Sequence, residues 1–207
     1  MHRISFGCRS HTMRKIIIIT KKIIMKQIII IALLALGFQH LNAQQYMDRS
    51  AYVGFFSETK MENIKADNNK GTLVYDAATG SIQMSALMKA FEFEKALMQE
   101  HFNENYVESD KFPKAVFKGR VENHTSLNLS KDGTYNVKVT GEMTMHGVTK
   151  KITTDAVFKV VGGKITCESK FNVKPEDYNI TIPNTVRDNI ASAIAITVKA
   201  NLEVLKK

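Results

Sequence analysis

The chain has 207 residues and a formal net charge of +9, a value that suggests a nucleic-acid partner. Seven of its basic residues and none of its acidic residues lie in the first 43 positions, which leaves 22 basic and 20 acidic residues in 44–207, a net charge of +2. A charge this small gives no electrostatic reason to expect phosphate binding, so the composition argues against a nucleic-acid partner.

Residues 1–24 are typical neither of a targeting signal nor of a folded domain. They mix basic residues with Cys8, His11 and the isolated apolar run Ile16 to Ile19. We interpret 1–24 as a mis-called N-terminal extension, with translation starting at Met25.

Residues 25–43 have the three-part pattern of a secretory signal peptide. Met25-Lys26-Gln27 is a short basic start, Ile28 to Phe38 is an unbroken apolar run, and Ala43 ends the polar part that follows. The apolar run is well short of the ~20 residues that span a bilayer, so we expect no stable membrane anchor after cleavage. We expect cleavage near Ala43 and a periplasmic or secreted product.

The pattern predicted for residues 44–207 is one all-β domain. Apolar and polar residues alternate with a period of two, and turn signals such as Asp76 to Gly80, His146-Gly147 and Gly162-Gly163 separate the runs. Eight consecutive strands leave two exposed edges unless the sheet closes, so we expect an eight-stranded antiparallel β-barrel. The strands are expected over residues 52–57, 71–75, 81–88, 115–121, 135–145, 152–160, 165–171 and 194–204.

Two segments interrupt this alternation. Residues 93–103 contain good helix formers, with apolar side chains at helical spacing. Residues 183–190 favour a short helix that Asn184 or Thr185 caps. We expect the first helix to cap an opening of the barrel, which suits a lipid carrier and equally suits a sealed core.

Side chains with catalytic or metal-binding chemistry are sparse in residues 44–207. The three histidines His101, His124 and His146 share no metal-ligand spacing, and the lone Cys167 excludes both an internal disulfide and a cysteine pair at a metal site. We expect His146 to serve turn geometry and hydrogen bonding, and Cys167 to be a small buried hydrophobe. No nucleophile elbow, phosphate loop or dinucleotide motif is present either, so we expect no metal site and no enzyme.

Flexible and aromatic side chains gather on the expected inner faces. Methionine is flexible and polarizable and suits a pocket that moulds around an irregular chain. An eight-stranded barrel is just wide enough either to fill with side chains or to hold one small ligand. Composition therefore leaves a filled core and a lipid-lined cavity both open. The candidate cavity-lining residues are Met84, Met88, Phe91, Phe93, Leu97, Met98, Phe102, Phe117, Val139, Met143, Met145, Phe158 and Phe171.

Three segments resemble the YceI-like family in order and spacing, over roughly residues 46–205. Phe112 to Gly119 (FPKAVFKG) is similar to the family's aromatic-Pro-x-Ala-x-Phe-x-small element. Gly141 to Lys150 (GEMTMHGVTK) closely resembles its Gly-x-Leu-Thr-x-His-Gly-Val-Thr-Lys hairpin. Lys174 to Ile180 (KPEDYNI) is similar to its Asp-Phe-Gly-Ile stretch, with Asn179 in place of the usual glycine.

The resemblance implies a lipocalin-like extended barrel, usually exported, with a long apolar tunnel that takes polyisoprenoid chains such as isoprenoid quinones. It favours a carrier that needs no cofactor and acts by sequestration. The alternative is a solid-cored barrel that serves as a periplasmic structural or stress-related interaction module without a lipid. A hydrolase is a more distant third. The sequence leaves the lipid's head group and the oligomeric state open, a dimer being one option.

Overall fold

The computed structural model describes residues 44–205, and the expected signal peptide and N-terminal extension lie outside the described residues. Strands dominate this region, and all of their pairings are antiparallel. The strands are β1 (Gln45–Glu58), β2 (Asn63–Asp76), β3 (Ser81–Leu87), β4 (Glu92–Phe93), β5 (Lys114–Val121), β6 (Gly133–Met145), β7 (Val148–Val161), β8 (Lys164–Val173) and β9 (Ile194–Val204).

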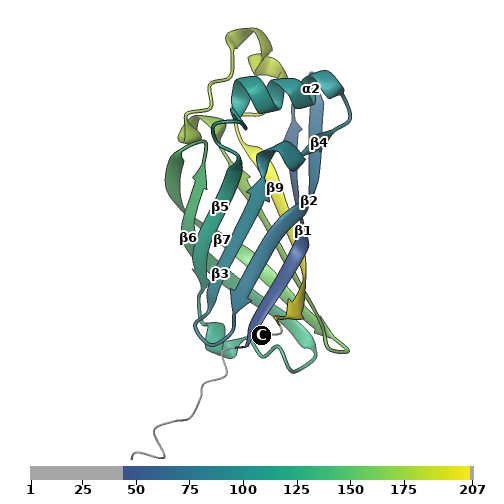
Figure 1. Cartoon of the computed structure of the whole chain (residues 1–207), viewed down its shortest axis with the longest axis vertical. Coiled ribbons are helices and arrows are strands. Elements are labelled where there is room, and N and C mark those ends of the chain that lie inside the picture. The colour runs from purple at the N-terminus through teal and green to yellow at the C-terminus, as the bar shows by residue number, and fades with distance from the viewer. Residues whose placement is uncertain (1–43, 206–207) are drawn as a thin grey trace, which may run out of the picture. The chain divides into compact units, whose positions relative to one another are not determined.

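The sheet closes on itself because β1 pairs with both β2 and β9. The order β1-β9-β8-β7-β6-β5-β3-β2 gives each of the eight long strands two neighbours, and closure leaves this barrel without a free edge (Figure 1). The predicted eight-stranded antiparallel barrel is confirmed. The extra strand β4, which pairs only with Ala66 and Asp67 of β2, is too short to be visible in the sequence pattern.

Left-handed backbone explains the hairpin residues and one departure from the family pattern. His146 and Gly147 have φ of 50° and 75°, and Gly162 and Gly163 have φ of 55° and 78°, as two-residue hairpin loops of type I′ require. Asn179, which stands where the family has glycine, has φ of 56°. Asparagine is one of the few other residues that tolerate this conformation, so the substitution keeps the turn.

Five of the six described helical segments gather at one end of the barrel, which we call the cap end (Figure 1). They are η1 (Met88–Ala90), α2 (Ala96–His101), η2 (Phe102–Tyr106), η4 (Pro175–Tyr178) and η5 (Asn184–Asn189). The bounds predicted for the first helix were wrong, because Phe93 pairs in β4 and the helical turns run on to Tyr106. The second predicted helix is a 3-10 helix that begins after Pro183, with no side-chain cap from Asn184 or Thr185.

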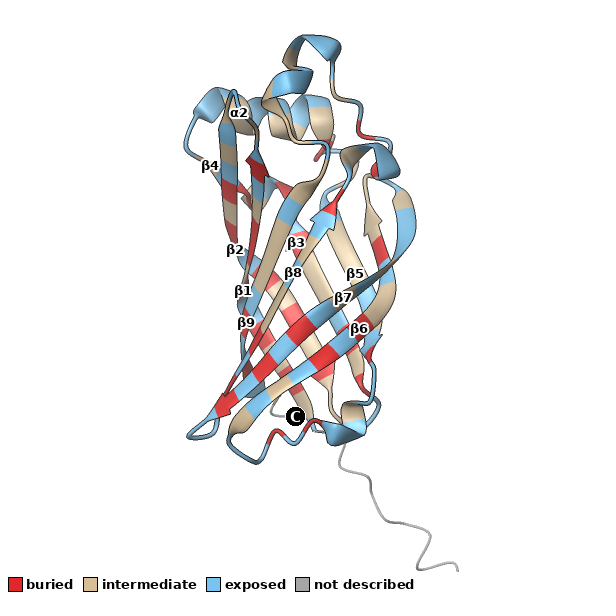
Figure 2. Ribbon diagram, turned by 180° about the vertical axis from the view of Figure 1, so that it is seen from behind, coloured by how far each residue is buried: buried red, intermediate tan, exposed pale blue. Residues whose placement is uncertain are grey.

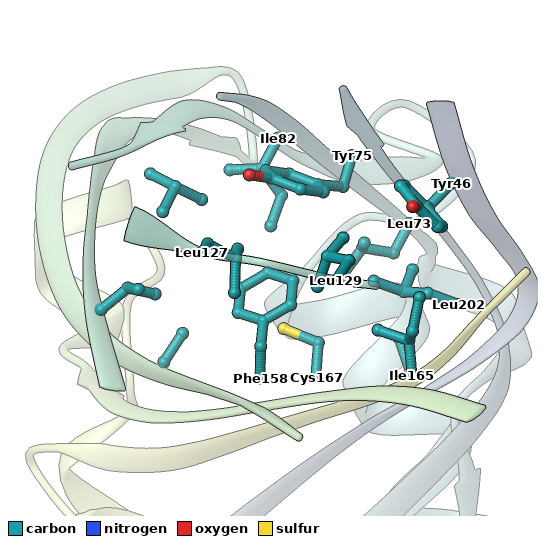
Figure 3. Close-up of a cluster of buried hydrophobic side chains, with 14 of the residues drawn as sticks. Tyr46, Leu73, Tyr75, Ile82, Leu127, Leu129, Phe158, Ile165, Cys167 and Leu202 are labelled. Atoms are coloured by element: carbon teal, nitrogen blue, oxygen red, sulfur yellow. The ribbon is translucent and has the colours of Figure 1, made fainter. Parts of the chain in front are cut away.

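The opposite end, which we call the closed end, is filled with side chains (Figure 3). Tyr75 and Phe158 are fully buried there, with ring centroids 5.3 Å apart. Leu127 and Leu129, which follow η3 (His124–Ser126), fold in from the loop that covers this end. The closed-end cluster comprises Tyr46, Ala51, Leu73, Tyr75, Ile82, Val121, Leu127, Leu129, Val137, Val139, Ala156, Phe158, Val160, Ile165, Cys167, Ala200 and Leu202.

A buried hydroxyl in this cluster gives a first prediction. The Tyr75 hydroxyl is buried without a hydrogen-bond partner among residues 44–205, and burial raises the pKa of Tyr75 to about 12. An unpaired buried hydroxyl costs about 1–3 kcal/mol, so we expect Tyr75→Phe to raise the free energy of unfolding by about 1 kcal/mol in urea denaturation. Tyr52→Phe is the matched control. It should lower the free energy of unfolding, because the Tyr52 hydroxyl donates a hydrogen bond to Asp67 at 2.6 Å. A less stable Tyr75→Phe protein contradicts the packing described here.

Candidate functional site

A cavity of about 260 Å³ lies at the cap end of the barrel. Its wall is mostly aliphatic and aromatic, and it draws on strands, on the helical segments and on the loop that follows η4. The lining side chains are Val53, Phe55, Ser57, Glu62, Ile64, Ala86, Met88, Phe91, Phe93, Met98, His101, Phe102, Tyr106, Val107, Ala115, Met143, Met145, Val173, Pro175, Ile180, Ile182, Val186, Asn189, Ile190, Ile194 and Ile196. A wall of this kind holds an apolar group by removing it from water.

Four phenyl rings form one side of this wall. Phe55 of β1 lies 6.0 Å from Phe91, 5.4 Å from Phe93 and 5.6 Å from Phe102, measured between ring centroids. Phe102 also lies 5.6 Å from Phe91 and 5.0 Å from Phe93, in tilted and edge-on arrangements that aromatic pairs prefer. These contacts hold the segment from Phe91 through α2 against the barrel strands.

The structure places seven of the thirteen candidate residues in the cavity wall. These are Met88, Phe91, Phe93, Met98, Phe102, Met143 and Met145. Because Met143 is 8% exposed and faces inward, the apolar face predicted for residues 135–145 is confirmed. That the cavity holds a ligand stays a prediction.

The other six candidates lie outside the wall. Val139 and Phe158 belong to the closed-end cluster, because strand alternation fixes the inward face of a residue and not its height in the barrel. Met84 and Phe117 lie just beneath the wall, packed between the closed-end cluster and a second cluster, and Phe171 packs against that second cluster only. We call the second one the cap-end cluster; it comprises Val53, Ala66, Ala86, Met88, Phe91, Val107, Met143, Val173, Tyr178 and Ile180. Leu97 is 61% exposed, since it lies on the outer face of α2.

Sequence reasoning missed a large part of the wall. Val53 and Phe55 share the inner face of a predicted strand, so the alternation within residues 52–57 already carried their signal. Ile194 and Ile196 likewise sit on the apolar face of the last predicted strand. Residues 180–190 carry no periodicity, so only the folded chain shows that side chains such as Ile182 complete the wall.

A polar rim, Ser57, Glu62, Lys95 and Asn189, ties the helical segments to the barrel. The Glu62 carboxylate accepts from Lys95 Nζ at 2.8 Å and from Asn189 Nδ2 at 3.4 Å. The hydrogen bond from Lys95 holds the pKa of Glu62 below its usual range. Ser57 Oγ, which is buried, accepts from the backbone N–H of Ala191 at 2.8 Å. The residues before α2 and after η5 are thereby fixed to β1 and to the start of β2.

His146 performs the structural role expected of it. Its Nδ1 lies 2.9 Å from the carbonyl oxygen of Tyr178, and its Nε2 lies 2.8 Å from Glu108 Oε2. The Phe112 ring packs edge-on against the imidazole, with centroids 4.6 Å apart. The imidazole therefore joins the β6–β7 hairpin to η4 and to the loop after η2.

The loss of this imidazole gives a second prediction. We expect His146→Asn to lower the free energy of unfolding by about 2 kcal/mol, because two hydrogen bonds are lost while asparagine still tolerates the positive φ. Lipid retention should be largely unchanged, since His146 is not in the cavity wall. His124→Asn is the control, because the His124 imidazole forms no hydrogen bond within residues 44–205. Urea denaturation and lipid extraction measure both variants, and complete loss of lipid from a folded His146→Asn protein contradicts the assignment.

Other reactive side chains are inert or isolated. Cys167 is 4% exposed, and burial raises the pKa of its thiol to about 12, which confirms the prediction of a small buried hydrophobe. Within residues 44–205, no three His, Cys, Asp or Glu side chains are grouped so as to hold a metal ion. The described helices are all too short or too polar to cross a membrane.

Fold and cavity together define a class of protein: a closed antiparallel barrel with an apolar hollow beneath a capped end. A model of the YceI-like domain matches residues 39–203, and the chain belongs to this family. The family resemblance carried by the three motifs is thus confirmed. A comparison with curated proteins finds no match.

Solved structures share this fold at low sequence identity. A polyisoprenoid-binding domain from Saccharophagus degradans, implicated in plant cell wall breakdown, has a TM-score of 0.68 at 14% identity, covering 79% of this chain and all of that one. BcnA from Burkholderia cenocepacia has a TM-score of 0.61 at 16% identity, covering 74% and 96%. A YceI protein from Campylobacter jejuni has a TM-score of 0.52 at 19% identity, covering 72% and 90%.

Proposed function

We propose that the domain is a non-enzymatic carrier that holds the apolar chain of an isoprenoid-type lipid in the cap-end cavity. The observation that carries the proposal is the contrast between the two halves of one barrel. Side chains fill the closed end, whereas the cap end keeps a cavity of about 260 Å³ behind flexible methionines and phenyl rings. The family relationship and the name of the Saccharophagus degradans domain support the same ligand class.

The energetics are favourable for a short apolar chain. Each buried CH₂ group contributes about 0.8 kcal/mol, so one five-carbon isoprene unit contributes several kcal/mol. Two or three units therefore contribute about 8–12 kcal/mol, which is comparable to the roughly 4–15 kcal/mol that association costs. Sequestration of this kind needs no bond to be made or broken, which agrees with a wall that offers few polar groups.

The filled-barrel alternative accounts for only half of the molecule. A solid core that serves a structural or stress-related module explains the closed-end cluster. It gives no reason for an apolar hollow at the cap end, where unfilled volume costs stability. The carrier therefore explains more of the described structure.

The proposal includes export, which the pattern of residues 25–43 supports. We expect the protein from a periplasmic fraction or from the culture medium to begin at or near Gln44, as its intact mass measures. A retained N-terminus on the exported protein contradicts this part of the proposal.

Organic extraction tests the ligand. Protein purified from its native source without detergent should release an isoprenoid-type lipid in near-stoichiometric amount, as identified by mass spectrometry. An extract of a control protein purified in the same way should lack this lipid. A native protein that releases no lipid, or only the average lipids of the membrane, contradicts the carrier.

A further inference from the structure

We propose that Met84 and Phe117 form the floor of the cavity and set the length of isoprenoid chain that the domain buries at two to three units. This inference rests on the proposed function and goes beyond it, because it replaces the expected long tunnel with a hollow of limited depth. Chains longer than the limit leave their remaining units outside the barrel.

The two side chains lie at the boundary between the filled and the hollow halves. Met84 of β3 and Phe117 of β5 are direct partners in the sheet, and both pack against the closed-end cluster and against the cap-end cluster. Two residues closer to the cap end on the same strands, Ala86 and Ala115 already line the cavity. On each of these two strands, the floor residue is therefore the next inward-facing residue below the cavity wall.

Glycines create the space that these two side chains occupy. The Met84 methyl lies 2.6 Å from the position that a Cβ on Gly71 would take, as near as the backbone oxygen of Ala51. The Phe117 ring lies 2.5 Å from the position of a Cβ on Gly119 and 2.7 Å from that on Gly141. At mid-height the barrel thus has three positions without side chains, and one methionine and one phenyl ring fill them. Removing either long side chain should deepen the hollow.

Below the floor the barrel offers no room for a chain. Tyr75 and Phe158 are fully buried, and Leu127 and Leu129 close the far end. Figure 2 shows the buried positions of β6 and β7 concentrated in the half away from the cap end. A ligand that enters at the cap end is therefore stopped at mid-height.

The depth of the hollow gives the length limit. The wall follows β1 from Ser57 to Val53, and four residues of a strand rise about 13 Å, or about 10 Å along the axis of a tilted barrel. An isoprene unit adds four chain bonds of about 1.5 Å, roughly 5 Å in projection. Two extended units, or three bent ones, reach the floor.

A series of prenyl alcohols on the purified domain tests this limit without any mutation. Geraniol, farnesol and geranylgeraniol contain two, three and four units and share one head group. We expect farnesol to bind at least as tightly as geraniol, and geranylgeraniol to match farnesol within about threefold, measured below the solubility limit of each. A tunnel without a floor should instead gain at least about tenfold with every added unit, because each unit leaves water.

Variants at the floor should move the limit in both directions. In each of the variants Met84→Ala and Phe117→Ala, geranylgeraniol should bind at least about tenfold more tightly than farnesol. Ala86→Leu, which raises the floor, should weaken farnesol at least about tenfold while geraniol changes little. Phe158→Ala, which opens space below the floor and away from the wall, is the control and should keep the plateau of the unmodified protein. Circular dichroism melts establish that each variant folds.

The outcomes separate this inference from the proposed function. A plateau after farnesol in the unmodified protein supports the floor. An affinity that rises steadily through geranylgeraniol overturns the length limit and leaves the carrier standing. Failure of all three alcohols to bind overturns the carrier and the length limit together. If a floor variant does not fold, the unmodified protein and Ala86→Leu still decide between these outcomes.

Discussion

Met143→Glu is expected to abolish lipid retention while the barrel stays folded. Met143 points inward from β6, is 8% exposed and lines the cavity. A carboxylate at this position faces an apolar chain with no partner, and such an unpaired charge costs several kcal/mol. We therefore expect the dissociation constant of farnesol to rise at least about 100-fold, since each 1.4 kcal/mol is a factor of ten.

The same variant reports on whether the cap end is hollow. In a hollow, water can surround the new carboxylate once the ligand is absent, so a cooperative thermal transition should remain. In a filled core the charge has no water to reach, and the protein should lose most of its stability. Thermal melts and lipid extraction on this one variant measure both effects.

Val157→Glu is the matched control, because Val157 faces outward on β7 and is 38% exposed. It adds the same charge to the barrel and should leave lipid retention unchanged, with only a small loss of stability because Glu168 lies directly opposite on β8. An unfolded Met143→Glu protein beside a folded Val157→Glu protein favours a filled barrel. A folded Met143→Glu protein that keeps its lipid places the ligand elsewhere.

Phe158→Ala should have the opposite profile, a large loss of stability with lipid retention kept. Phe158 is fully buried beside Tyr75 and lies below the cavity floor. Truncating a buried phenylalanine to alanine costs about 3–5 kcal/mol, a large fraction of the stability of a domain. We expect the melting temperature to fall by roughly 10 °C for a domain of this size.

Phe93→Ala provides the comparison at the cap end. Phe93 is only partly buried and contacts Phe55 and Phe102 in the cavity wall. Phe93→Ala should lower the free energy of unfolding less than Phe158→Ala does. It should weaken the binding of farnesol more than Phe158→Ala does. Equal effects of the two variants on binding and on stability would contradict the division of the barrel into a stabilising half and a binding half.

The strand pattern predicted most of the fold because the barrel is half solvated along every strand. Alternation between polar and apolar residues, as in residues 135–145, reports directly on the two faces of a strand. Residue pairs that tolerate positive φ, such as Gly162-Gly163, indicated the hairpins, because a two-residue loop is also determined by the local sequence. The two-residue β4 was missed because it forms only through its contact with β2.

The site was only partly predicted, because the alternation of apolar and polar residues does not show where a residue lies along the barrel axis. Met143 and Val139 have the same inward pattern, yet Met143 lines the cavity and Val139 lies in the filled half. Helical spacing alone did not show that Leu97 lies on the outward face of its helix. The Ile180 to Ile190 segment depends on tertiary contacts such as that between Asn189 and Glu62, which leave no periodic trace in the sequence.

The central claim is that an isoprenoid chain occupies the cap-end cavity, and methionine methyl groups test it most directly. Residues 44–205 contain seven methionines, of which Met88, Met98, Met143 and Met145 line the cavity. Met61, which is 72% exposed, is the internal control.

A methyl NMR titration of ¹³C-methyl-methionine protein with farnesol should shift the four cavity resonances together, in a saturable way and with one molecule bound. The Met61 resonance should stay in place. Saturable binding that leaves the four cavity methyls unshifted contradicts the account, because the chain then lies somewhere other than the cap-end cavity.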